Sequence, residues 1–314
     1  MVGAAAAFVD TEGRFYKALQ DGARGGRELA LYERVWGMKD TQGAVLPLVH
    51  TDSGHGTVQQ GGPPGTASGS HQSAISSPDE ALHLRRFIPA YFGSLEQNGQ
   101  QLLILSDVCH GMSKPCVIDI KVRKTLASSP RPGLRSDLLM DMMGLSTAYD
   151  WADPSSTRKN RLKDASTTQS SMGFRVCGYR VYRPATGDYV VVGKEHGRRL
   201  TPDTMQAALA HFAAAGSSTP ATVFRSALPQ LRQLETWFST QTSLQFFASS
   251  VLIVYDGDVT HSQEGTTSSS MHQQVRVQMI DFAHSFPITS GHLDTNVLTG
   301  IRTLIQTLEH ISGQ

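Results

Sequence analysis

An aspartate and a lysine stand two residues apart in the apolar run PCVIDIK at residues 115–121. An apolar run of this length predicts a strand, and side chains at i and i+2 of a strand point to the same face. Asp119 and Lys121 would therefore lie side by side, one as an acceptor and one as a cation. A structural salt bridge is the ordinary interpretation of an isolated Asp-x-Lys pair.

Two further segments favour a functional interpretation of that pair. The run VRVQMIDFAH at residues 275–284 alternates apolar residues and ends in Asp281, and the run SSVLIVYD at residues 249–256 precedes it with Ser250. A carboxylate at a strand end beside a nucleotide site is a common way to hold magnesium. A capping or ion-paired role is the alternative for Asp281, and an ordinary strand serine is the alternative for Ser250.

Together these segments resemble the inositol polyphosphate kinase family, whose marks are a Pro-x-x-x-Asp-x-Lys-x-Gly strand, a Ser-Ser-Leu-Leu strand and an Ile-Asp-Phe strand end. The resemblance implies an α+β, two-lobed, protein-kinase-like fold, with ATP and Mg²⁺ as cofactors. Arg123 stands where the family motif has glycine. Alternatively the strand is interrupted by an insertion, and Met143-Gly144 with Tyr149-Asp150 restores the pattern; we favour this second alignment.

The resemblance also assigns the nucleotide site. It implies that Lys17 contacts the ATP phosphates and that Glu28, on the following helix, orients it. The backbone groups of Ser106 and Val108 would hold adenine, and Asp119 the ribose. Asp281 would bind the metal, with support from Ser250. A solvated surface position is the alternative for Lys17.

The substrate site is assigned in the same way. Lys121 matches a lysine that meets substrate phosphate, and Arg180 and His284 match further phosphate-binding positions. The only dense basic cluster consists of Arg158, Lys159, Arg161 and Lys163, where relatives place basic side chains against the inositol phosphates. A solvated charged face is the alternative for the cluster, and a structural histidine is the alternative for His284.

The local patterns predict elements that suit this fold. We expect a hairpin over residues 8–20, strands over 101–105, 173–182, 250–255 and 275–281, and helices over 27–36, 201–215, around 228–238 and from 294. Polar inserts interrupt them at 51–78, 123–142 and 257–273; the first is expected to be disordered. The expected division is a lobe of residues 1–107 and a lobe of residues 108–314.

Composition limits the other classes of function. The chain of 314 residues carries 28 Lys and Arg against 27 Asp and Glu, a net charge of +1, so it lacks the overall positive field that nucleic-acid binding favours. Three cysteines without a Cys-x-x-Cys pair indicate an intracellular, reduced protein, in the cytoplasm or nucleus. No apolar run approaches the roughly 20 residues of a membrane span. We expect a monomer without stable membrane anchoring.

The sequence therefore predicts an ATP- and magnesium-dependent kinase acting on inositol tris- and tetrakisphosphates, of the multikinase type. Two alternatives stay open. One is a hexakisphosphate kinase that makes pyrophosphates. The other is a catalytically degenerate scaffold that binds inositol phosphates, favoured by Arg123 and by a glycine-rich turn reduced to Val2-Gly3-Ala4-Ala5.

Overall fold

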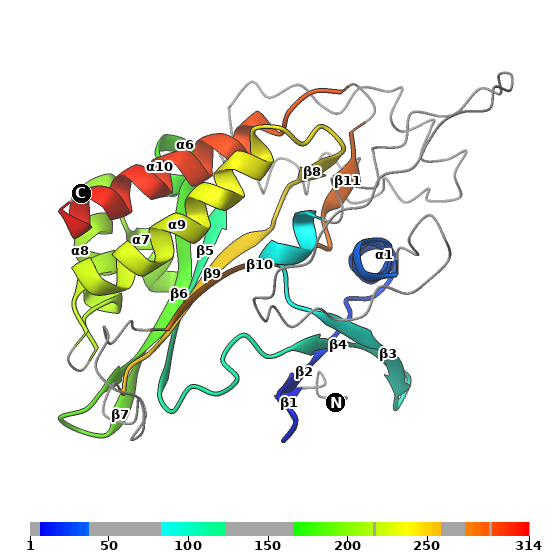
Figure 1. Cartoon of the computed structure of the whole chain (residues 1–314), viewed down its shortest axis with the longest axis horizontal. Coiled ribbons are helices and arrows are strands. Elements are labelled where there is room, and N and C mark those ends of the chain that lie inside the picture. The colour runs from blue at the N-terminus through cyan, green and yellow to red at the C-terminus, as the bar shows by residue number, and fades with distance from the viewer. Residues whose placement is uncertain are drawn as a thin grey trace, which may run out of the picture.

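Two antiparallel sheets organise the chain in the computed structural model, which describes residues 7–37, 83–123, 166–215, 218–258, 274–288 and 291–313 (Figure 1). The first sheet has the order β1-β2-β4-β3 and the second the order β10-β9-β5-β6-β7. A short pair, β11-β8, completes the described strands. The strands are β1 (Phe8–Val9), β2 (Arg14–Ala18), β3 (Tyr91–Gln97), β4 (Gln100–Ser106), β5 (Pro115–Val122), β6 (Phe174–Arg183), β7 (Asp188–Val192), β8 (Leu244–Phe246), β9 (Ser250–Asp256), β10 (Val275–Ile280) and β11 (Ser285–Pro287).

Helices cover one face of the larger sheet, whereas α1 lies beside the smaller one (Figure 1). The helices are α1 (Ala23–Trp36), the 3-10 turn η1 (Arg85–Phe87), α6 (Thr168–Ser171), α7 (Lys194–Arg199), α8 (Pro202–Phe212), α9 (Pro220–Phe238) and α10 (Thr295–Ser312). Reciprocal capping boxes start α8 at Thr201 and α9 at Thr219, each with proline in the first turn. Asp294 caps α10 by accepting from the backbone N–H of Val297.

The alternation of side chains along β5 gives the larger sheet two different faces. Cys116, Ile118 and Ile120 are fully buried on the face that packs in the hydrophobic core. The intervening positions, which include Asp119 and Lys121, are only partly buried on the opposite face. The sheet thus presents its polar residues on the side away from the core.

Most element predictions are confirmed. The first hairpin, the strands around 101–105 and 173–182, and the helix that starts after Asp294 occur where the sequence places them. The expected hairpin also forms, with Val275 opposite Tyr255 and Ile280 opposite Ser250. The helix expected over 27–36 begins earlier, at Ala23, and the helix expected over 201–215 ends at Phe212.

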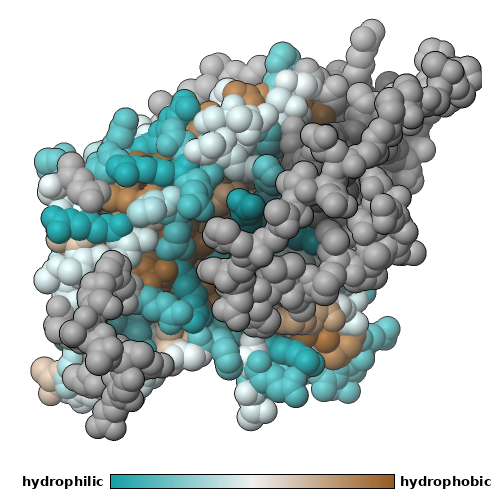
Figure 2. Space-filling model, in the orientation of Figure 1, coloured by the Kyte–Doolittle hydropathy of each residue, from teal (hydrophilic) through white to brown (hydrophobic). Residues whose placement is uncertain are grey.

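The described surface offers few large apolar side chains. In Figure 2 hydrophobic residues show in limited patches between hydrophilic ones, and the exposed large apolar residues among those described are Phe8, Val9, Phe92, Tyr189 and Val191. Of the helices that the structure describes, none combines the length and apolar character needed to span a bilayer. The three polar inserts lie largely outside the described residues.

Candidate active site

Lys17 sits between two carboxylates that come from different parts of the chain. Its Nζ lies 2.7 Å from Oε1 of Glu28 on α1 and 2.6 Å from Oδ1 of Asp281, which follows β10. Burial by itself lowers the pKa of Lys17, but the charges of Asp281 and Glu28 outweigh it, so that the pKa is raised. Lys17 is therefore held as a cation at neutral pH.

The two carboxylates differ in access to solvent. The side chain of Glu28 is 1% exposed, and its Oε1 also accepts from the backbone N–H of Phe282 at 3.1 Å. The side chain of Asp281 is 47% exposed. Glu28 thus fixes both the lysine and the backbone after Asp281, whereas Asp281 keeps carboxylate surface available for a ligand.

Asp281 also has an unusual backbone. Its φ is +66°, in the left-handed region that non-glycine residues rarely adopt, although Asp tolerates it better than most. The hydroxyl of Ser249 donates to its carbonyl oxygen at 2.9 Å, and Glu28 holds the next N–H. Such conformations persist where neighbouring contacts enforce them, and they concentrate at functional sites.

The row of side chains next to Asp281 contains buried polar atoms without well-formed hydrogen bonds. Register places Lys121 opposite Ser250, and Ser250 opposite Ile280, the residue before Asp281. Oδ1 of Asp119 and the hydroxyl of Ser250 are buried, and neither makes a well-formed hydrogen bond with another described residue, although the Ser250 hydroxyl lies near enough to the Asp119 carboxyl to lower its pKa. Because buried polar atoms are nearly always satisfied in a working protein, these two atoms indicate a ligand site.

Asp119 and Lys121 place a carboxyl group and an ammonium group on the same face of β5. Burial raises the pKa of the Asp119 carboxyl; the nearby Ser250 hydroxyl and Lys121 oppose this effect, and Asp281 adds to it. Lys121 forms no ion pair with any residue that the structure describes. An ammonium group on this face can therefore neutralise phosphate.

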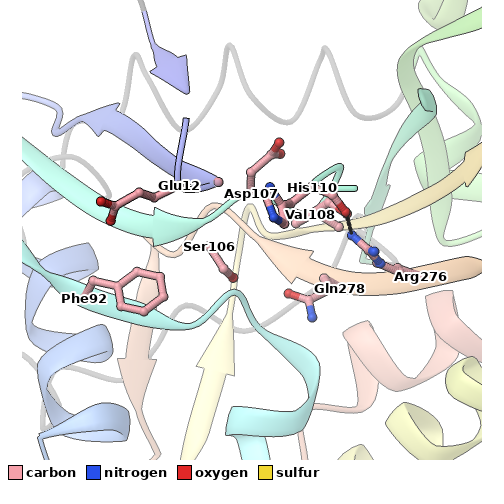
Figure 3. Close-up of a pocket in the computed structure, with 9 residues that line it drawn as sticks. Glu12, Phe92, Ser106, Asp107, Val108, His110, Arg276 and Gln278 are labelled. Atoms are coloured by element: carbon pink, nitrogen blue, oxygen red, sulfur yellow. Dashed lines mark hydrogen bonds between the residues drawn. The ribbon is translucent and has the colours of Figure 1, made fainter. Parts of the chain in front are cut away.

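A pocket of about 340 Å³ lies between the two sheets, where β4 leads into the second sheet (Figure 3). The predicted adenine-binding residues, Ser106 and Val108, line it, and Gln278 of β10 lines it from the other sheet. The segment is fixed by the Asp107 N–H, which donates to the carbonyl of Gly13 at 2.8 Å. Gly13 has φ +75°, and an added Cβ would strike the ring of His110, so this turn requires glycine.

The remaining predicted substrate residues are placed less closely together. Arg180 is exposed, lies opposite Val117, and has its guanidinium 5.2 Å from the ring centroid of Tyr189. Val117 is four residues from Lys121, about 13 Å along the strand, so Arg180 is not brought together with Lys17 and Asp281. His284 follows Asp281 by three residues, and its carbonyl accepts from the N–H of Phe247. Both assignments stay predictions.

The basic cluster of Arg158, Lys159, Arg161 and Lys163 lies outside the described residues, as do Met143-Gly144 and Tyr149-Asp150. Arg123, which breaks the expected motif, is described and buried. Its Nη1 donates to the carbonyl of Phe246 at 2.7 Å and lies 3.8 Å from Oδ1 of Asp294. Arg123 therefore has a structural role in positioning the start of α10.

Several residues of the site region were missed in the sequence, and three of them bear on its geometry. Arg276 and Gln278 line the pocket, and Arg27 of α1 donates to the carbonyl of Ala283 at 2.8 Å. The alternation of β10 could have revealed the first two, because burying Val275 and Val277 on one face turns Arg276 and Gln278 to the other. Nothing local in the sequence indicates the contact of Arg27.

Comparisons with known proteins give a consistent family. The sequence model described as "Inositol polyphosphate kinase" matches residues 102–309. Inositol polyphosphate multikinase beta of Arabidopsis thaliana is 26% identical over 322 residues, which cover 96% of this chain and 86% of the relative. Inositol hexakisphosphate kinase 3 of Mus musculus is 29% identical over 207 residues, covering 65% of this chain and 46% of the relative. The chain thus spans about half the length of that kinase.

The fold has solved counterparts. The inositol phosphate multikinase Ipk2 of S. cerevisiae, solved in complex with ADP and Mn²⁺, superposes with a TM-score of 0.56 at 23% identity. The superposition covers 72% of this chain and 89% of the yeast chain. A second inositol phosphate multikinase structure gives a TM-score of 0.54. The predicted α+β, kinase-like fold class is confirmed.

Proposed function

Because the chain belongs to the inositol polyphosphate kinase family, as its motifs predicted, we propose that it transfers the γ-phosphoryl group of ATP to hydroxyls of inositol tris- and tetrakisphosphates. The observation that carries the proposal is the cluster of Lys17, Glu28 and Asp281, which meets the buried polar atoms of Asp119 and Ser250. Phosphoryl transfer needs this combination of a fixed cation, a carboxylate for a metal and polar groups that position the nucleotide.

The residues fit a divalent metal held mainly by one carboxylate. Oδ1 of Asp281 contacts Lys17, and the side chain as a whole is about half exposed. Among the described residues no group of three or more His, Cys, Asp or Glu side chains could hold a metal. Asp281 would therefore share Mg²⁺ with phosphate oxygens and water, as Mg²⁺ commonly is shared. Bound there, Mg²⁺ would supply positive charge that offsets the charge developing on the phosphate oxygens.

The chain's own residues supply positioning and charge. Lys17, oriented by Glu28, would contact the phosphates, and Lys121 would face the transferred group or the acceptor. Val108 and Ser106 would hold the base, and Asp119 the ribose hydroxyls. The acceptor hydroxyl oxygen attacks the γ-phosphorus, the bond to the bridging oxygen of ADP breaks, and the hydroxyl proton leaves to solvent. Electrostatics and positioning account for most catalysis of such a loose transition state.

A pyrophosphate-forming kinase is the second candidate. The 29% identity with hexakisphosphate kinase 3 supports it. The multikinase hypothesis has the wider support, because the match to Arabidopsis multikinase beta extends over 96% of this chain. The two candidates are therefore distinguished by which inositol phosphate accepts the phosphoryl group.

The test is transfer of label from γ-labelled ATP, with Mg²⁺, to inositol tris-, tetrakis-, pentakis- and hexakisphosphate. We expect label on tris- and tetrakisphosphate, and a loss of at least 10³-fold in Asp281→Asn, because the metal carboxylate is removed. Asp188→Asn, at an exposed position of β7, is the matched control and should keep full activity. Label only on hexakisphosphate would select the second candidate. Nucleotide binding without any transfer would instead favour the scaffold.

A further inference from the structure

The strongest unused polar group in the nucleotide region is the side chain of Gln278. It lines the pocket that the Ser106–Val108 segment forms, and its Oε1 is buried without a hydrogen-bond partner among the described residues. An amide placed so, at the wall of a ligand pocket, leaves a hydrogen bond to be made by whatever enters.

Register sets where this amide lies. Gln278 is opposite Leu252 of β9, and Leu252 is opposite Asp119 of β5. The three side chains form one row across the sheet, with Gln278 and Asp119 two strand spacings apart, about 9.6 Å. Each end of the row carries a buried acceptor without a well-formed hydrogen bond to another described residue. A nucleoside that places its ribose at Asp119 can reach Gln278 with its base.

The neighbouring arginine fixes the opposite wall of the pocket. Nη1 of Arg276 donates to the carbonyls of Val108 and His110 at 2.7 and 2.8 Å (Figure 3). The backbone N–H of Val108 is a separate group, and it makes no hydrogen bond to another backbone group among the described residues. A base in the pocket is thus offered a backbone donor on one side and the Gln278 amide on another.

We propose that Gln278 determines nucleobase specificity by pairing with the N6 amino group and N7 of adenine. This inference rests on the proposed use of ATP. A glutamine amide has one donor and one acceptor in the arrangement that adenine's N6–H and N7 complement, and proteins use this bidentate pair to read adenine in DNA. Guanine presents two acceptors, O6 and N7. Whichever way the amide is turned, one acceptor then faces another, so GTP is disfavoured.

The test compares four nucleotides on the wild-type chain and on Gln278→Leu: ATP, GTP, 7-deaza-ATP, which lacks the N7 acceptor, and purine riboside triphosphate, which lacks the amino group. The measured quantity is kcat/KM for transfer to inositol tetrakisphosphate. In the wild type we expect each adenine analogue to lose at least fivefold against ATP. In Gln278→Leu, kcat/KM for ATP and the preference for ATP over GTP should fall roughly 5- to 150-fold.

The decisive measurement is the N7 penalty, which is the loss in kcat/KM when 7-deaza-ATP replaces ATP. In Gln278→Leu, 7-deaza-ATP and ATP should differ by less than twofold, because the N7 contact is already gone; a merely structural role would not remove that penalty. Gln206→Leu, at an exposed position of α8, is the matched control and should keep the wild-type pattern. A Gln278→Leu variant that keeps the N7 penalty and the ATP preference would overturn the assignment.

The failure of this inference can be told from failure of the proposed function. A wild-type chain that uses ATP but treats 7-deaza-ATP alike would overturn only the role of Gln278. A wild-type chain that neither binds nor turns over any of the four nucleotides would overturn both. Thermal unfolding without nucleotide checks that Gln278→Leu is folded, and Gln278→Glu provides a second variant. Its carboxylate keeps an acceptor for N6–H but faces N7 with a second acceptor, so it should prefer 7-deaza-ATP to ATP.

Discussion

At the scale of single residues, Lys17 is the centre of the site because it compensates two carboxylates at once. Glu28 is almost wholly buried, and its Oε2 has no partner among the described residues. Removing a cation from such a group leaves a charge in a low-dielectric environment, which costs far more than the loss of an exposed ion pair. The stability of the chain should therefore depend on Lys17 even without nucleotide.

We predict that Lys17→Met lowers the free energy of unfolding by about 3 kcal/mol, since Glu28 loses its buried partner. Urea unfolding at pH 7 measures this. The double variant Lys17→Met/Glu28→Leu should recover part of the loss, because it removes the stranded charge as well. Lys194→Met, at an exposed position of α7, is the control. Equal stability of wild type and Lys17→Met would contradict the geometry of the cluster.

Asp119 should affect stability in the opposite direction from Lys17: its carboxylate should lower the stability of the nucleotide-free chain although it is needed for function. Its pKa is raised chiefly by burial, so the folded chain binds more protons than the unfolded chain between the ordinary aspartate pKa of about 3.9 and the raised value. Stability contributed by this group therefore falls as pH rises through that window, and the penalty is fully present above it.

We accordingly expect Asp119→Asn to raise the stability of the nucleotide-free protein at pH 7, by an amount of the order of 1 kcal/mol. The gain should shrink as pH is lowered toward 4, while kinase activity is lost. Urea unfolding at pH 7 and pH 4.5 gives the comparison, with Asp188→Asn as the exposed control. A gain that is independent of pH would show that the carboxylate charge is not its cause.

At the scale of elements, the start of α10 depends on a residue that breaks the expected sequence motif. Asp294 accepts from the N–H of Val297 as the helix cap and from the N–H of Phe246 at 2.8 Å. Burial raises the pKa of Asp294, and Arg123 opposes that shift. Arg123 also lies with its guanidinium 4.0 Å from the ring centroid of Phe247. One arginine thus joins the end of β5 to β8 and α10.

Restoring the family glycine with Arg123→Gly should therefore destabilise the protein. We predict a loss of about 3 kcal/mol in the free energy of unfolding, because Asp294 would be buried without its cation. Arg123→Met is the control: it fills much of the arginine's volume but carries no charge, so comparing it with Arg123→Gly separates the loss of packing from the loss of the charge. A stable, more active Arg123→Gly would support the view that this arginine marks a degenerate site.

The sequence predicted those elements whose pattern is local. The run at 275–284 shows its alternation, its strand end and its carboxylate together, so β10 and Asp281 could both be found. By contrast β3 was missed, because Gly93, Ser94 and Glu96 give it no apolar alternation, and it is held by pairing with β4. Arg123 was seen only as a departure, since its partners Phe246 and Asp294 are more than 120 residues away.

At the scale of the whole molecule, the two sheets are joined at both ends of β10. At one end Lys17 and Glu28 contact Asp281 and Phe282. At the other end Arg276 of β10 holds the segment that leaves β4, through the carbonyls of Val108 and His110. The proposed catalytic groups and the predicted adenine-binding segment are thereby fixed to opposite ends of the same strand, β10.

Weakening the contacts of Arg276 with Val108 and His110 should affect nucleotide binding more than the phosphoryl-transfer step. Arg276→Gln removes a charged donor from two carbonyls, and hydrogen bonds to charged groups commonly contribute more than neutral ones. We predict a three- to tenfold rise in KM for ATP with kcat changed less than twofold. Amide hydrogen exchange over residues 107–112 should become faster while exchange around Lys17 stays unchanged. Arg302→Gln, which removes a partly exposed pair with Glu235 and a hydrogen bond to Ser239 away from the pocket, is the control. A fall in kcat with KM unchanged would contradict this prediction. It would mean that Arg276 acts through β10 on the cluster of Lys17, Glu28 and Asp281 at the other end of the strand.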